Sequence, residues 1–367
     1  MACIAEALGV TLPNASCIPA VVSEHSRLAV ATGRKAVELA WNRNQPLSML
    51  TRESFLNALI TQLTLSGSTN AIVHMIAMAG RAGFRITLDD YDAISNHVPV
   101  LADLRPSGKF LMEDFYNAGG LSALLHQLQD VLHLNAQTIN GVTLGEQIAH
   151  ASVIDPAVIR PRDNPLWPTG GTCVLRGNLA PDGCVIKTVA ADPRLQKHVG
   201  PALVFNSYED LKLRINRADL PVTPDSVLVL RSAGPVGAPG FPEWGMLPIP
   251  DKILKMGIRD MVRISDARMS GTSYGTCVLH VAPESHVGGP LALVQDGDLI
   301  ELDVDARKLQ LLVDDERLEE RRKAWRPPEI RWTRGYLKMF SQHITQANEG
   351  CDFDFLHGHS AGLEPEI

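Results

Sequence analysis

The spacing of apolar residues changes near the middle of this 367-residue chain. Up to about residue 160, apolar positions recur every three or four residues, which predicts helices. From about residue 165 the pattern becomes short β-branched runs separated by turn residues, which predicts strands. The clearest helical segments are 27–41, 53–65, 71–79 and 121–134.

The first residues already have the pattern of a helix. Ile4, Ala5 and Leu8 recur at helical spacing with no capping residue before them, so we expect the chain to begin within a domain. Farther along, Thr87 followed by Asp90 predicts a helix start, because the hydroxyl and the carboxylate can satisfy free amide groups in the first turn.

Eight short runs in the second half are strand candidates. The turn residues Pro181-Asp182-Gly183 precede one of them and predict a hairpin with the run before. So many short strands favour a barrel or a sandwich. A charged helix over 314–325 follows, and Pro327-Pro328 cannot continue it. The candidate strands are 172–176, 184–188, 202–205, 227–231, 261–264, 276–281, 299–304 and 309–313.

Composition excludes some classes of protein. There are 34 basic and 41 acidic residues, giving a formal charge of -7 without a long basic run, so nucleic acid is not an expected partner. No run of eighteen apolar residues occurs, and the first residues lack the pattern of a signal peptide. We therefore expect a soluble, cytoplasmic protein. The six cysteines are scattered, without a C-x-x-C pair, and are expected to be reduced and buried.

Two polar segments in the first half could bind a ligand. Ser68, Thr69 and Asn70 come directly before an apolar helix, where amides and hydroxyls can meet an anion. The alternative is a plain helix cap. The segment Pro106-Ser-Gly-Lys-Phe-Leu-Met-Glu-Asp114 suits either a substrate-binding loop or an ordinary helix start.

Two further segments lie among the strand candidates. Gly234-Pro-Val-Gly-Ala-Pro-Gly-Phe-Pro-Glu243 is a stiff loop ending in a carboxylate, so Glu243 is a candidate magnesium ligand. Ser270 lies in a turn that follows a strand candidate, and is a candidate base or nucleophile. It is not in a G-x-S-x-G motif, so a serine hydrolase is a weaker hypothesis, and a plain turn serine is the alternative. We assign no role to His357-Gly-His359.

Several motifs together resemble one enzyme family. Ser66-Gly-Ser-Thr-Asn-Ala71, the 106–114 segment, Leu175-Arg-Gly-Asn-Leu-Ala-Pro181 and Asp266-Ala-Arg-Met-Ser-Gly-Thr272 are similar in order and spacing to the dihydroxyacid/phosphogluconate dehydratases. Arg160-Pro-Arg-Asp-Asn-Pro165 and the ending 346–355 look most like the aldonate dehydratases that act on arabinonate or xylonate. The branched-chain amino-acid branch, the dihydroxy-acid dehydratases, is the weaker fit.

The resemblance implies an α/β fold and a reaction. It implies the remainder of an N-terminal α/β/α sandwich over 1–164, a β-barrel domain over 165–330 and a C-terminal tail over 331–367. The family eliminates water from a sugar acid to give a 2-keto-3-deoxy acid, using a [2Fe-2S] cluster and Mg²⁺. By the same resemblance the partners are a sugar acid and further copies of the chain, in a dimer or tetramer, with no membrane.

The resemblance also assigns residues. Ser270 matches the serine that removes the C2 proton, Thr272 a substrate-binding hydroxyl, and Glu243 a magnesium ligand. Three cluster cysteines, a carbamylated lysine and the other acidic magnesium ligands belong to a family segment that would precede Met1. The cluster is therefore predicted to be absent from this chain.

Two hypotheses follow from these departures. The chain is a fragment of an active dehydratase, or an inactive remnant that binds a full-length paralogue. Either way, we expect the chain alone to be inactive and only marginally stable. Ser66 is a minor departure, because the family usually has glycine there, and we expect it to have little effect.

Overall fold

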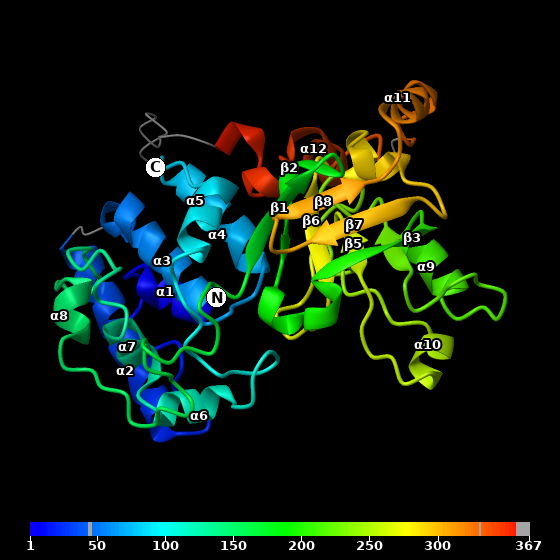
Figure 1. Ribbon diagram of the computed structural model, residues 1–367. Helices are drawn as coiled ribbons and strands as arrows, with labels where there is room; N and C mark the ends of the chain where they lie inside the picture. Colours follow the sequence, from blue (N-terminus) through cyan, green and yellow to red (C-terminus); the bar gives the residue numbers. More distant parts are fainter. Residues whose placement is uncertain (43–45, 330–331, 357–367) are drawn as a thin grey trace.

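The computed structural model describes residues 1–42, 46–329 and 332–356. Its first 150 residues form a helical part that lies beside a barrel (Figure 1). Threonine caps start three of the helices: Thr51, Thr87 and Thr143 each form a capping box with the residue three positions on. The helices are α1 (Ala2–Ala7), α2 (Ser23–Trp41), α3 (Arg52–Thr64), α4 (Asn70–Arg81), α5 (Leu88–Ser95), α6 (Met112–Asn117), α7 (Gly120–His126) and α8 (Leu144–Ile148).

The second half is a closed barrel of eight strands in the order β1-β2-β6-β5-β4-β3-β7-β8. The predicted α/β class and the predicted barrel are confirmed. Four helices accompany the barrel: α9 (Tyr208–Arg214), α10 (Asp251–Lys255), α11 (Asp315–Ala324) and α12 (Tyr336–His343). The strands are β1 (Cys173–Gly177), β2 (Ala180–Ile186), β3 (Lys197–Phe205), β4 (Val227–Leu230), β5 (Arg263–Ser265), β6 (Cys277–Ala282), β7 (Leu299–Asp303) and β8 (Lys308–Leu311).

The barrel mixes two kinds of strand pairing. Strands β3, β4, β5 and β6 run parallel to one another, so each connection between them crosses back along the barrel. The remaining contacts are antiparallel, except that β1 meets β8 in parallel at a single pair, Arg176 and Lys308. The long crossovers leave room for the loops 231–262 and 266–276, which carry the candidate residues of this half.

One hydrophobic core extends from the helical part to the barrel, and a second fills the barrel interior. Alternate residues of β2 point to opposite sides: Ile186 lies inside the barrel, whereas Val185 packs into the core of the helical part. Leu279 of β6 and Met269 of the loop between β5 and β6 join Val185 in that core. The helical part therefore covers the barrel face made by β1, β2 and β6, and the loop containing Met269 lies between them.

Charged groups also cross this contact. Arg307, between β7 and β8, donates hydrogen bonds to Asp92, Ser95 and Asn96 of α5 and the residue after it. Arg176 of β1 pairs with Asp89 at the start of the same helix. Helix α5 is thus fixed to the barrel by two arginines.

The predicted hairpin turn was wrong in its position. The turn between β1 and β2 lies at Asn178, and residues 181–183 are inside β2. Asn178 is held by β8, because its side chain exchanges two hydrogen bonds with the backbone of Leu311. Gly183, at φ +100°, produces a bulge in β2 instead of a turn.

The helix predicted over 121–134 is shorter than expected, ending at His126. Asn57 of α3 explains part of this difference. Its side chain accepts a hydrogen bond from the backbone N–H of His133 and donates one to the carbonyl oxygen of the same residue. These two bonds occupy backbone groups that a continuing helix would use.

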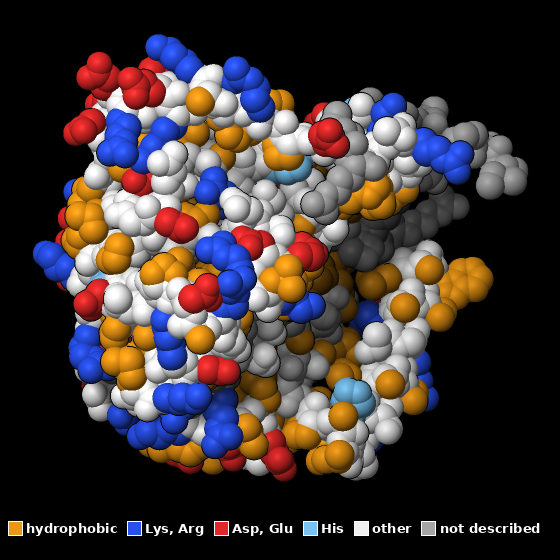
Figure 2. All heavy atoms as spheres, turned by 90° about the vertical axis from the view of Figure 1, so that its right-hand side faces the viewer, with side chains coloured by type: hydrophobic (Ala, Val, Ile, Leu, Met, Phe, Trp, Pro, Cys, Tyr) orange, Lys and Arg blue, Asp and Glu red, His pale blue; other side chains and the backbone are white. Residues whose placement is uncertain are grey.

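The barrel side of the surface is mixed in charge. Figure 2 shows Lys and Arg side chains interspersed with Asp and Glu, so no large patch of one sign covers this face. No helix in the described part of the chain has both the length and the apolar character needed to cross a membrane.

Candidate functional site

The predicted site residues come together between the helical part and the barrel. Ser68 lies at the entry to α4, and Gly271 lies in the 266–276 loop. A Cβ atom on Gly271 would be only 2.9 Å from Cβ of Ser68, so the two backbones approach closely where only glycine fits. This contact places Ser68 next to Ser270 and Thr272, although about 200 residues of chain separate them.

Ser270 and Thr272 form a pair of hydroxyls at this contact. Their side-chain oxygens are 3.1 Å apart and hydrogen-bonded, and Thr272 is exposed. Ser270 also accepts a long bond, 3.5 Å, from the backbone N–H of Thr272. The pair can therefore present a donor and an acceptor to a ligand that contacts the loop.

Asn70 connects the helical part to the proline-rich loop. Its side-chain amide donates a hydrogen bond to a carboxylate oxygen of Glu243. Asn70 is buried, whereas Glu243 is exposed. The backbone N–H of Asn70 donates to the hydroxyl of Ser68 at 3.2 Å. Ser68, Asn70 and Glu243 thus form one hydrogen-bonded group beside the Ser270 turn.

Several buried oxygens near this group have no hydrogen-bond partner among the described residues. Such atoms are costly unless water or a ligand reaches them. Ser66 lies against Gly171, whose Cβ position is 2.7 Å from its hydroxyl, so the segments 62–70 and 170–172 adjoin. We therefore expect water or a polar ligand to contact these oxygens between the two segments. The unpartnered atoms are Oε1 of Gln62 and the hydroxyls of Thr64, Ser66, Thr69 and Thr172.

Two buried carboxylates that the sequence reasoning missed hold the proline-rich loop. Glu284, after β6, accepts hydrogen bonds from the backbone N–H groups of Val236 and Gly237, at 2.8 and 2.9 Å, and from the side chain of Gln346, at 3.0 Å. Burial, reinforced by the charge of Asp266, raises the pKa of Glu284 to about 7. These bonds satisfy two backbone amides of the proline-rich loop.

Asp266 joins this loop to the Ser270 loop. It is fully buried and accepts bonds from the N–H of Ala233, at 3.0 Å, and from both the N–H and the hydroxyl of Ser285, at 2.9 and 2.6 Å. Burial raises the pKa of its carboxyl above the usual range. Asp266 therefore fixes the start of the loop in which Ser270 lies.

A buried histidine also lies here. The φ angle of His280 is +57°, and its ring lies 5.6 Å from that of Phe241 in the proline-rich loop. Burial, with the nearby charge of Arg268, lowers the pKa of His280 to about 3, so the ring is neutral. Arg268 in turn donates a 2.5 Å hydrogen bond to the carbonyl oxygen of Phe241. These contacts lock the two loops together.

The 106–114 segment has a structural role in the described contacts. Gly108 turns tightly against Asp103, whose carboxylate accepts the N–H of Lys109 at 2.9 Å. Asp114 accepts the N–H of Leu111 at 2.7 Å and so caps α6. The helix-start interpretation accounts for Asp114. His357 and His359 lie outside the described residues.

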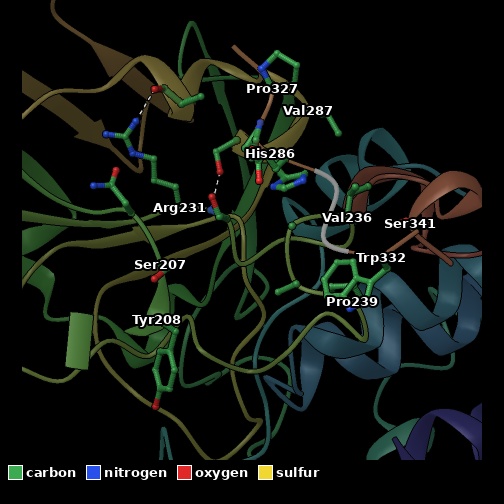
Figure 3. Close-up of a pocket in the computed structure, with 18 of the residues that line it drawn as sticks. Ser207, Tyr208, Arg231, Val236, Pro239, His286, Val287, Pro327, Trp332 and Ser341 are labelled. Carbon is green, nitrogen blue, oxygen red and sulfur yellow. Dashed lines mark hydrogen bonds between the residues drawn. The ribbon is translucent and has the colours of Figure 1, made fainter. Parts of the chain in front are cut away.

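A large cavity lies on the other side of the proline-rich loop. It has a volume of about 1390 Å³ and is bounded by the barrel, the loop and the segment that carries α12. Figure 3 shows Arg231 at one end and Trp332 at the other, with Val236 and Pro239 of the loop between them. None of the site residues predicted from sequence lines it.

The described residues include no group of three or more His, Cys, Asp or Glu side chains placed to hold a metal ion. Five of the six cysteines are buried and all six are free thiols, as the sequence predicted. Burial raises the pKa of the Cys173 thiol to about 12 and that of the Cys17 thiol to about 11. Such thiols are poor metal ligands.

Comparison with known proteins agrees with this architecture. Two family models match the chain: dihydroxy-acid/6-phosphogluconate dehydratase N-terminal over residues 1–147, and the C-terminal model of the same family over residues 157–351. The break between them falls just before the barrel.

The chain is also similar to individual enzymes. It is 50% identical to a 6-deoxy-6-sulfo-D-gluconate dehydratase of Pseudomonas putida, over 100% of this chain and 64% of that protein. It is 45% identical to an L-arabinonate dehydratase of Rhizobium leguminosarum bv. trifolii (strain WSM2304), over 96% of this chain and 62% of that protein. A dihydroxy-acid dehydratase of Methanococcus aeolicus is 40% identical, over 96% of this chain and 63% of that protein.

The chain therefore spans less than two thirds of the length of these relatives. Its two matched regions together cover nearly all of the sequence. The chain belongs to the dihydroxy-acid/6-phosphogluconate dehydratase family.

Proposed function

We propose that this chain supplies part of the active site of a hydro-lyase that dehydrates a sugar acid, such as arabinonate or xylonate, to a 2-keto-3-deoxy acid. The observation that carries the proposal is the meeting of Ser68 and Asn70 from the helical part with Glu243, Ser270 and Thr272 from the barrel loops. The names of relatives at 45–50% identity support an aldonate or a related sugar acid as substrate.

The polar groups suit a substrate with many hydroxyls. The unpartnered oxygens around Ser66 and Thr172 can exchange hydrogen bonds with hydroxyl groups, since each serine or threonine side chain both donates and accepts. The first turn of α4 provides the positive end of a helix, which favours a carboxylate. We infer that Ser68, Thr69 and Asn70 orient the acid end of the substrate.

The reaction removes a proton from C2 and a hydroxyl group from C3, leaving an enol that becomes the keto acid. In this proposal Ser270 takes the C2 proton, and Thr272, 3.1 Å from it, holds Ser270 and one substrate oxygen in place. In this proposal Asp266 and Glu284 hold the proline-rich loop and the 266–276 loop in place and do not touch the substrate. Because the C2 proton of a carboxylate is weakly acidic, the developing negative charge needs strong stabilisation.

The residues present do not fit the cofactors that the resemblance implies. A [2Fe-2S] cluster needs thiolate ligands gathered in one place, whereas the cysteines here are dispersed and mostly buried. Mg²⁺ takes several oxygen ligands, and Glu243 has only Asn70 as a polar neighbour in the described contacts. No step is therefore assigned to either group. We infer that the groups that stabilise the developing charge belong to the part of the relatives' sequences that this chain does not match.

A chimera tests the proposal. In it, this chain replaces the matching region of the Pseudomonas putida relative. We expect the chimera to form 2-keto acid from a sugar acid, and the chain alone to form none. Ser270→Ala in the chimera should lower kcat by roughly 100-fold or more, the usual loss for a general base, whereas Ser341→Ala on α12 should not. A folded chimera without turnover on any sugar acid would refute the proposal.

Dihydroxy-acid dehydration is the second candidate. Relatives of that activity match at 40–42% identity, lower than the sugar-acid enzymes. Comparing the chimera on an aldonate and on a branched dihydroxy acid decides between them. A higher kcat/KM for the branched acid would favour this candidate.

A further inference from the structure

Lys187 is the only buried lysine among the described residues, with 3% of its surface exposed. It follows β2, and its backbone is still extended before the short helical turn that begins at Thr188. Its ammonium group has no hydrogen bond or ion pair with any described residue. Burial lowers the pKa of Lys187 to about 8, so most of these side chains are still protonated at pH 7. A buried cation without a partner destabilises a fold.

Arg263, the buried arginine of β5, shows how this fold otherwise accommodates a buried cation. Its guanidinium donates a hydrogen bond to the carboxylate of Asp260 at 2.6 Å. It also donates to the carbonyl oxygens of Leu247 and Met261, at 3.1 and 3.3 Å. The charge of Arg263 is therefore balanced inside the chain. Because Lys187 has no such partners among the described residues, we expect a bound group to supply them.

The pairing of β1 with β2 places Lys187 beside Thr172. Cys173 lies opposite Ile186, so the same antiparallel pairing continued by one residue brings Thr172 opposite Lys187. Side chains opposite each other lie on one face of the pair. Val185, two residues before Lys187, is on the face that packs into the core of the helical part. Lys187 and Thr172 therefore point toward the helical part, which lies beside β1 and β2 in Figure 1.

On its other side, Lys187 adjoins the end of the 266–276 loop, which carries the proposed base. Ile186 pairs with Val278 of β6. The same pairing continued by one residue brings Lys187 opposite Cys277, the first residue after the loop. The side chain of Cys277 also belongs to the core shared with the helical part. Lys187 thus lies between the start of β1 and the loop of the candidate site.

Unpartnered hydroxyls accompany this lysine. The hydroxyl of Thr172 is buried and has no hydrogen-bond partner among the described residues. Gly171 packs against Ser66, whose buried hydroxyl is also unpartnered in the described structure. A carboxylate suits these groups, because one of its oxygens can pair with an ammonium group while a hydroxyl donates to the other.

We propose that Lys187 binds the carboxylate of the sugar acid, and that Thr172 donates a hydrogen bond to the same group. The inference rests on the proposed function and identifies a cation that this chain contributes to substrate binding. The first turn of α4 then approaches the acid end from the helical part, and Lys187 approaches it from the barrel. A neutral polyol of the same length lacks the charge that Lys187 pairs with.

Binding of two related ligands to the chain tests the proposal. At pH 7 we expect calorimetry to show L-arabinonate binding more tightly than uncharged L-arabinitol by roughly ten-fold or more, the usual effect of a hydrogen bond to a charged group. Lys187→Met should bind both ligands equally. Lys255→Met, which changes an exposed lysine on α10, should keep the preference. Equal affinity of the unsubstituted chain for both ligands, undetectable binding included, or a preference that survives Lys187→Met, would overturn the proposal.

Stability distinguishes a ligand-binding lysine from a structural one. Without ligand, Lys187→Met removes an unpaired buried charge and should raise the urea midpoint of unfolding. Saturating L-arabinonate should then raise the midpoint of the unsubstituted chain more than that of the variant, because only the folded unsubstituted chain binds it well. A lower midpoint for Lys187→Met without ligand would show that Lys187 stabilises the fold, and would overturn the proposal.

The chimera separates this inference from the proposed function. In an active chimera, Lys187→Met should raise KM for the sugar acid by roughly ten-fold or more, because substrate binding is lost. It should lower kcat far less than Ser270→Ala does, since proton transfer is retained. A folded chimera without turnover refutes the proposed function and leaves the binding result standing. Turnover with an unchanged KM for Lys187→Met overturns only the role of Lys187.

Discussion

Glu284 makes the stability of this protein depend on pH. Its folded-state pKa is raised from 4.5 to about 7, so the folded chain holds a proton that the unfolded chain releases. The contribution of Glu284 therefore favours folding below pH 4.5 and is lost as the pH rises to about 7. Because Glu284 is only 1% exposed, solvent does not screen the effect.

We predict that Glu284→Gln flattens this dependence. The variant cannot ionise, so its loss of unfolding free energy between pH 5 and pH 8 should be smaller than that of the unsubstituted chain by roughly 2–3 kcal/mol. Urea denaturation at the two pH values measures it. Exposed Glu146→Gln on α8, whose carboxyl pKa is lowered by hydrogen bonds from Thr143, should not flatten the curve. If the unfolding free energy of Glu284→Gln changed with pH as much as that of the unsubstituted chain, the raised pKa of Glu284 would be contradicted.

Ser66 is strained, which the sequence did not reveal. Its φ is +50°, in the left-handed region, and its buried hydroxyl has no hydrogen-bond partner in the described structure. We predict that Ser66→Gly raises the unfolding free energy by about 1 kcal/mol by relieving both costs. Thermal denaturation measures the change. Ser341→Gly inside α12 is the control and should lower stability by a few tenths of a kcal/mol. An unchanged melting temperature for Ser66→Gly would instead support the expectation of little effect.

Sequence reasoning was more informative about polar residues in local motifs than about buried carboxylates. Ser68, Asn70, Glu243 and Ser270 stood out because they lie in unusual turns, and the structure brings them together, while their roles stay predictions. Glu284 and Asp266 were missed because their partners are backbone amides of a distant loop, which leave no pattern in the sequence around them. Only the fold reveals such acceptors.

At the scale of elements, the sequence predicted which segments form strands better than it predicted where elements begin and end. All eight strand candidates correspond to strands, since short β-branched runs between turn residues are typical of a barrel. The ends moved where a side chain from another element holds the backbone. Asn57 of α3 does this at His133, and Asn178 does it at β8. Contacts between distant elements cannot be read from local patterns.

The joint between α5 and the barrel depends on one arginine. Arg307 is half-buried and is hydrogen-bonded to Asp92, Ser95 and Asn96. We predict that Arg307→Ala lowers the unfolding free energy by about 2 kcal/mol, because it leaves Asp92 without its cation. Arg194→Ala removes a surface pair with Asp192 and should cost much less, because solvent screens that pair. Urea denaturation measures both variants. Equal losses of unfolding free energy would show that Arg307 contributes no more than a surface ion pair.

Thiols converge nowhere in the described part of the chain. Its cysteines are distributed over both halves, with Cys3 and Cys17 in the helical core and Cys184 in the barrel interior. We predict that incubation with iron and sulfide under reducing conditions leaves the folded chain colourless. The Pseudomonas putida relative, treated in parallel, shows whether the conditions permit assembly. A stable brown chromophore on the folded chain would contradict the prediction.

The closing pair of the barrel has a consequence for synthesis of the chain. Strands β1 and β8 meet at Arg176 and Lys308, so the ring cannot shut until more than a hundred residues have emerged from the ribosome after β1. Contacts between such distant segments form slowly, because the loop entropy is lost before the contact stabilises anything. Until then, the faces of β2 and β6 that carry Val185 and Leu279 have only the helical part to cover them. The early helices therefore act as a template that keeps the open sheet from aggregating while translation finishes.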